Sequence, residues 1–179
     1  DAGAKTENTV DASPTPTNTP TDGDGDSDGA EEPAQDTPTE PEQHPTPVEP
    51  EAMKTGDKAG AIAAAQYFVE VIEYSMDTTT VELLEKYSYE KCGRCNHLID
   101  VINNRIHEDV TPISSSYTIK NLESAIFAGE GDVVWKLPVL LEIEEKYLEE
   151  PYKVEDSAEI IIIIAYENTG WVLIEIEGA

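Results

Sequence analysis

Two cysteines, Cys92 and Cys95, stand three residues apart and are the only cysteines in the 179-residue chain. They fall where a helix is predicted to begin, and the helix N-terminus with Lys91 and Arg94 would favour a thiolate. Such a pair could act in redox chemistry, but a thioredoxin-type pair lies in a βαβ unit, whereas this one follows two predicted helices. We interpret the pair as a disulfide that fixes the helix start, with a redox role as the alternative. A loop this short would contribute about 2 kcal/mol of stability.

Other patterns that could bind metals or catalyse reactions are incomplete. The segment from Asp24 to Gly29 matches the first half of a calcium loop, but the twelfth position is Gln35 where a bidentate Glu is needed. His97 and His107 lack the spacing that would complete a zinc site with the cysteines. We therefore expect no metal and no other cofactor. The sequence contains no nucleophile elbow, phosphate-binding glycine loop or HExxH motif, which favours a protein that is not an enzyme.

The charge of the chain excludes several partners. There are 38 Asp and Glu against 11 Lys and Arg, a formal net charge of -27. Such a chain repels nucleic acids and anionic membrane surfaces. Its longest apolar run, from Ile160 to Ala165, is far shorter than the ~20 residues that cross a bilayer. The remaining candidates are an unknown protein partner or a neutral or cationic small ligand.

The elements that would position these residues begin after a long polar segment. Residues 1–57 hold 15 acids, two bases and nine of the 12 prolines, and no aromatic residue, Leu or Ile. Such a segment cannot bury enough apolar area to offset its conformational entropy, so we predict a disordered acidic Pro/Thr-rich spacer. Residues 58–179 carry all the aromatic residues and suffice for one domain core.

The first half of this domain has helical periodicity. Apolar residues recur at three- and four-residue steps over about 58–76, and again in the helix that starts near Cys92. Between them, Thr79 and Glu82 have the spacing of a capping box, which predicts a short helix to about Tyr87.

The second half has the two-residue period of β-strands. About four long antiparallel strands are predicted, starting near Ser115, Asp132, Lys153 and Trp171. Pro138 lies inside the second and predicts a bulge, a bend or an edge there. Five consecutive isoleucines from Ile160 make both faces of the third strand apolar, so a homodimer contact or a ligand pocket would have to cover the face away from the helices. Helices followed by strands indicate an α+β fold.

Several segments together resemble a family of actinobacterial secreted lipoproteins whose domain has no assigned function. They are residues 67–74, the Leu83-Leu84 pair, the C-x-x-C from Cys92 to Cys95, and the closing Gly170-Trp171-Val172. The resemblance covers about residues 59–177 and implies an NTF2-like, cystatin-like α+β domain, with three N-terminal helices packed on a bent antiparallel sheet. It also implies a signal peptide and a lipid-bearing cysteine before Asp1. The protein would lie at the extracellular face of the cytoplasmic membrane or be secreted. Any contact with the membrane would be made through the lipid anchor alone.

The same resemblance implies a cavity between helices and sheet, where enzymes such as ketosteroid isomerase place an Asp base and Tyr donors. Candidate cavity residues are Tyr67, Tyr74, His97, Asp100, Tyr117 and Tyr166. None aligns with a catalytic motif of such enzymes, and tyrosines on amphipathic helices are commonly core residues. We therefore expect a non-enzymatic extracellular binding or interaction module, with a small-molecule carrier or enzyme as the alternative.

Overall fold

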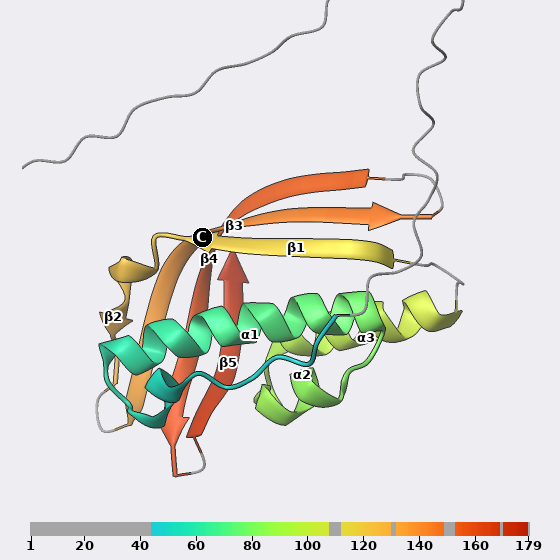
Figure 1. Cartoon of the computed structure of the whole chain (residues 1–179). Coiled ribbons are helices and arrows are strands. Elements are labelled where there is room, and N and C mark those ends of the chain that lie inside the picture. The colour runs from blue at the N-terminus through green and yellow to red at the C-terminus, as the bar shows by residue number, and fades with distance from the viewer. Residues whose placement is uncertain (1–43, 108–111, 130–131, 149–152, 169, 179) are drawn as a thin grey trace, which may run out of the picture. The chain divides into compact units, whose positions relative to one another are not determined.

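The computed structural model in Figure 1 describes residues 44–107, 112–129, 132–148, 153–168 and 170–178. Three helices lie in the curve of a bent antiparallel sheet, which confirms the predicted α+β architecture. The elements in chain order are η1 (Glu51–Lys54), α1 (Lys58–Thr78), α2 (Glu82–Tyr87), α3 (Gly93–His107), β1 (Pro112–Lys120), η2 (Leu122–Ser124), β2 (Ile126–Phe127), β3 (Val133–Tyr147), β4 (Lys153–Glu167) and β5 (Gly170–Gly178).

The long helix α1 forms because its sequence combines a cap with small, strongly helix-forming residues. The Asp57 carboxylate accepts a hydrogen bond from the Gly60 N–H at 2.9 Å, which satisfies one of the free donors of the first turn. The alanines that follow are buried and let neighbouring elements approach closely. The helix ends at Thr79 in the left-handed region, with φ of 53°. The predicted capping box is therefore wrong, because Thr79 terminates α1 and α2 follows Val81 without a side-chain cap.

The sheet has five strands in the order β1-β3-β4-β5, with β2 paired beside β1 on the same edge of β3. β1 ends opposite Leu140 and β2 begins opposite Lys136. Pro138 lies between these two positions and pairs with β4 on its other side, so its missing N–H faces a gap in the ladder. The prediction of a local edge at Pro138 is confirmed, and β2 is the strand that the four-strand prediction lacked.

The two faces of the sheet differ in what covers them. On the inner face, toward the helices, Leu137, Ile162 and Leu173 are essentially inaccessible to solvent. On the outer face Ile161 is half-buried, although its neighbour Ile163 is buried. In the part of the chain that the structure describes, the helices lie on the inner side and no element packs over the outer face (Figure 1).

Residues 44–57, which we call the N-terminal strap, pack on the domain. Met53 is 6% exposed. The Trp135 indole N–H donates to the Gly56 carbonyl at 3.2 Å, and the Tyr166 hydroxyl donates to the Lys54 carbonyl at 2.8 Å. These contacts with the sheet are made by residues that precede the predicted boundary at residue 57. The sequence concealed this because the strap buries one large apolar side chain and is otherwise held through backbone groups that any residue offers. Residues 1–43 of the predicted spacer lie outside the described residues.

Candidate functional site: a cavity between helices and sheet

A cavity of about 420 Å³ lies between the inner face of the sheet and helices α1 and α3. Its wall is mostly apolar and comes from both layers. The apolar lining residues are Phe68, Val69, Ile72, Met76, Leu98, Leu141, Ile143, Val154, Ala158, Ile160, Ile162, Leu173 and Ile176. β3 and β4 continue past the end of β5, and the inner face near Ile143 and Ala158 is only partly covered. The cavity can receive an apolar group.

One wall of the cavity is polar and is centred on Glu145. The Arg105 guanidinium lies 3.2 Å from the Glu145 carboxylate, and the Tyr117 hydroxyl donates to it at 2.6 Å. The Tyr147 hydroxyl also hydrogen-bonds the carboxylate and lies 2.7 Å from Arg105. Burial, reinforced by the hydrogen bond to Glu145, raises the pKa of Tyr117 and of Tyr147. Both hydroxyls therefore stay protonated and act as donors.

A second polar group lies beside the cavity, where α1 meets the strap. The Asp77 side chain is 1% exposed, and its carboxylate lies 3.1 Å from the His44 imidazole. Neither carboxylate oxygen has a hydrogen-bond partner of good geometry among the described residues. Burial raises the pKa of Asp77 above its ordinary value, and it also raises the pKa of Glu73, which accepts the Tyr117 backbone N–H at 2.7 Å. This group fastens the strap to α1.

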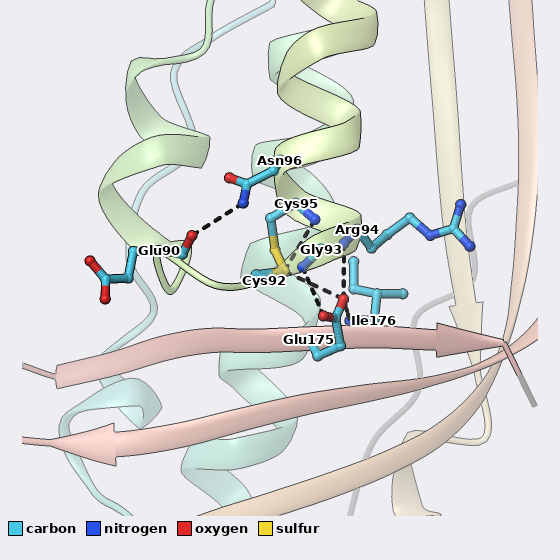
Figure 2. Close-up of a disulfide and its surroundings, with 8 residues drawn as sticks. All are labelled: Glu90, Cys92, Gly93, Arg94, Cys95, Asn96, Glu175 and Ile176. Carbon is cyan, nitrogen blue, oxygen red and sulfur yellow. Dashed lines mark hydrogen bonds between the residues drawn. A yellow bond between two sulfur atoms is a disulfide. The ribbon is translucent and has the colours of Figure 1, made fainter.

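The sulfur atoms of Cys92 and Cys95 lie at disulfide distance, and both residues are completely buried. Figure 2 shows the pair at the start of α3, next to Glu175 of β5. The Cys95 N–H points at the Cys92 sulfur, 3.1 Å away. The Glu175 carboxylate accepts the Gly93 N–H at 2.8 Å and the Arg94 N–H at 3.0 Å.

Glu175 occupies the position that a reactive thiolate would need. Although burial opposes the effect, the backbone donors of Arg94 and Gly93 lower the pKa of Glu175, so the helix N-terminus already holds a negative charge. A register shift in β5 between the partners of Ile163 and Ile164 leaves one extra residue just before Glu175. This geometry favours a disulfide that fixes the first turn of α3 over an exchangeable redox pair.

The predicted cavity residues are dispersed. Tyr117 lines the cavity. Tyr67 lies in the core, where its hydroxyl meets that of Tyr87 at 3.3 Å. Tyr74 faces the strap and accepts from Thr46 at 3.5 Å. Asp100 and His97 are exposed on α3, and Tyr166 packs on Trp171 at the opposite end of the sheet.

The separation of these residues has a simple geometric cause. α1 is buried around most of its circumference, so a tyrosine on it can be buried without facing the cavity. The residues that sequence reasoning missed are Arg105, Glu145 and Tyr147. A signal for Glu145 was present, because the alternation that places Leu141 and Ile143 on the inner face also places Glu145 there.

The described residues hold no cluster of three or more His, Cys, Asp or Glu side chains that could bind a metal ion. The calcium-loop resemblance at 24–29 lies outside them. None of the described helices combines the length and hydrophobicity that a membrane crossing requires.

The fold and cavity define the chain as an α+β domain in which helices and a bent sheet enclose a largely apolar pocket. The chain belongs to a family of unknown function, DUF6318, whose model matches residues 29–177. A search of curated proteins found no match. Among solved structures, the intermembrane space region of the chloroplast protein ARC6 is similar, with a TM-score of 0.53 and 10% identity, covering 69% of this chain and 98% of that chain. At that identity the similarity concerns the fold alone.

Proposed function

We propose that this protein is a non-enzymatic binding module of the cell envelope, and that its cavity receives the apolar part of a partner or ligand. The observation that carries the proposal is the cavity of about 420 Å³, open beside Ala158 and lined mainly by aliphatic side chains. Binding sites are typically concave and apolar with a few fixed polar groups. Here Arg105, Glu145 and Tyr117 supply those groups.

The polar wall favours binding over catalysis. A general acid or base must have a free hydrogen-bonding position toward the substrate. The donors of Tyr117, Tyr147 and Arg105 converge on the Glu145 carboxylate. The carboxylate thus accepts from both hydroxyls and from the Arg105 Nη2, whereas the Arg105 Nη1 has no partner among the described residues. A guanidinium keeps its proton near neutral pH, so this free donor can bind a ligand but is a poor general acid.

The location outside the cytoplasmic membrane rests on the sequence resemblance and on the acidic segment before the strap. An extended Pro-rich segment spans up to ~3.1 Å per residue, so 43 residues would reach on the order of 130 Å from a lipid anchor. When the native host is grown with an alkyne-bearing fatty acid, the membrane-associated protein made from the full-length precursor should carry the alkyne label. Absence of label on the membrane-associated protein would contradict the anchor.

Binding in the cavity can be tested with the neutral fluorescent probe N-phenyl-1-naphthylamine. We expect its fluorescence to rise on mixing with the full chain, and we expect Ala158→Trp to reduce the affinity at least tenfold by filling the mouth. Ser157→Trp is the matched control. Ser157 directly precedes Ala158 in β4 and is also exposed, but it faces the other side of the sheet. Equal loss in both variants, or no binding by the native chain, would contradict the proposal.

A small-molecule carrier is the second candidate, because the cavity volume falls within the range of ligand pockets in proteins. Native mass spectrometry of protein purified from its own host should then show a bound small molecule. Ala158→Trp should remove that mass, while Ser157→Trp should retain it.

A further inference from the structure

Half of β4 has an unpaired edge. β5 pairs with Ile160–Glu167, and its register with β4 ends at the Ile160–Gly178 pair. Among the residues that the structure describes, nothing pairs with the same side of β4 over residues 153–159. All of these residues except the half-buried Val154 are exposed. This edge offers backbone donors and acceptors in the spacing that an added strand requires.

The unpaired edge borders the cavity. Val154, Asp156 and Ala158 lie on the inner face of β4, opposite Glu145, Ile143 and Leu141 of β3, and all six line the cavity. An extended segment paired with this edge would therefore direct every second side chain toward the cavity.

The charges around the edge restrict what can occupy it. Asp156, Glu159 and Glu177 are exposed at the cavity rim, and none of them pairs with a cation among the described residues. Arg94 is the exposed base among the residues that line the cavity. Lys153, at the start of the edge, is also exposed, but Glu144 and Glu155 pair with it. A second copy paired edge to edge would bring these acids together. The chain's own residues 1–43 carry 12 acids and one base, so they are repelled as well.

We infer that the β4 edge at residues 153–159 binds an extended segment of a partner protein in which aliphatic residues alternate with Lys or Arg. The segment adds a strand to the sheet: backbone hydrogen bonds align it, and its aliphatic side chains enter the cavity. Its basic side chains meet Glu159 and compete with Lys153 for Glu155, which Lys153 contacts at 2.8 Å. Strand addition of this kind takes affinity from the main chain and specificity from pockets for alternate side chains. The inference rests on the proposed function and names the class of partner.

The test uses a fluorescein-labelled peptide of alternating lysine and valine, measured by fluorescence anisotropy with the full chain. Two control peptides accompany it: one with two adjacent central amides N-methylated, which keeps the charge and side chains, and one with glutamate in place of lysine. We expect both controls to bind at least tenfold more weakly. We expect Glu155→Lys combined with Glu159→Lys to weaken the lysine peptide at least tenfold. Glu90→Lys with Glu123→Lys, two exposed acids elsewhere with the same charge change, should alter it less than threefold.

Hydrogen exchange locates the contact. Bound peptide should slow exchange of amides within residues 153–159. Unchanged exchange there, or equal binding of the N-methylated peptide, would overturn the inference by showing that attraction is electrostatic alone. N-phenyl-1-naphthylamine separates the two proposals: if the probe enters the cavity but the peptide does not bind, this inference fails and the proposed function stands. If neither binds, both fail.

Discussion

Glu145 is the residue on which the polar wall of the cavity depends. Its carboxylate lies on the inner face of β3, and the side chains of Glu145 and Arg105 are 10% and 14% exposed. Charged side chains at this depth lose most of their hydration, so the free energy of burying them depends on the ion pairs and hydrogen bonds that they form. Arg105, Tyr117 and Tyr147 are those partners.

Glu145→Gln should therefore be strongly destabilising. It leaves the Arg105 charge buried without its counter-ion, a change that costs about 3 kcal/mol in comparable pairs. Urea unfolding measures the effect. Glu144→Gln is the control, because this neighbour pairs with Lys146 and Lys153 at the surface, where solvent screens the interaction and its loss should change stability far less. Equal effects of the two substitutions would contradict a buried network.

Asp77 is a buried carboxylate whose pKa is raised by burial, although Ser115 and His44 act in the opposite direction. Because burial raises its pKa, the folded protein holds this proton more tightly than the unfolded chain does. The protonated form is thus favoured on folding. Stability from this group is fully present below the ordinary pKa of 3.8 and is lost as the pH rises through the raised value.

Asp77→Asn should accordingly stabilise the protein at pH 7, by about 1–3 kcal/mol if the substitution removes an uncompensated buried charge. The advantage should shrink as the pH falls toward 4, because Asp77 then becomes neutral in the native protein as well. Urea unfolding of both proteins at several pH values checks this. A difference independent of pH would show that the pKa of Asp77 is the same in the folded and the unfolded chain, which would contradict a costly burial.

At the scale of elements, the strap is the part whose role changes most from the sequence-based expectation. It covers α1 and the end of the sheet through Met53, Gly56 and Lys54. Gly60 records how close this contact is, since a Cβ there would lie 1.9 Å from the Thr55 carbonyl oxygen. The strap therefore belongs to the folded unit.

Two truncations separate the strap from the segment before it. Deletion of residues 1–43 should leave the thermal midpoint within about 2 °C, because it removes none of the described contacts. Deletion of residues 1–57 should lower stability by about 2–5 kcal/mol, since it uncovers the pocket of Met53 and removes the cap of α1. Calorimetry measures both. Equal midpoints would restore the sequence-based boundary at residue 57.

The α3 helix shows how distant segments complete an element. Its first turn is held by the cysteine pair from within and by Glu175 of β5 from outside (Figure 2). The C-x-x-C spacing indicates the first of these contacts. The second depends on the register shift in β5, which no local pattern specifies.

At the scale of the whole molecule, the outer face of the sheet favours association of two copies, whereas the net charge of -27 opposes it. Val134, Leu140 and Ile161 are half-buried on this face and would gain from a partner surface. Two copies meeting there would also bring together two strongly acidic molecules. Salt screens this repulsion, because the Debye length falls from ~30 Å at about 0.01 M to ~3 Å at about 1 M.

We therefore expect the protein to dimerise through the outer face as salt rises, and to be monomeric at low salt. Sedimentation velocity over this range measures the change. Ile161→Thr should weaken the dimer at least fivefold, whereas Val48→Thr, at an exposed valine on the strap, should not. A monomer at every salt concentration would exclude this contact.

The sequence by itself determined the type and order of the elements. Three helices and the long strands follow from periodicity, because a helix or strand with one buried face must repeat apolar residues at its own period. The edge at Pro138 follows from the missing backbone N–H of proline. The start of the third helix follows from the position of the cysteine pair. The acidity of the chain is likewise fixed by composition.

Only the tertiary structure decided which side chains meet. Tyr117 lines the cavity, and the other predicted cavity residues, Tyr67, Tyr74, Asp100 and Tyr166, do not. Their positions depend on the orientation of α1 about its own axis and on the registers of the strands. Arg105 and Glu145 are 40 residues apart, and His44 and Asp77 meet because the strap folds back over α1. Periodicity reports which face of an element is buried, but the partner of that face is set by packing between elements distant in sequence.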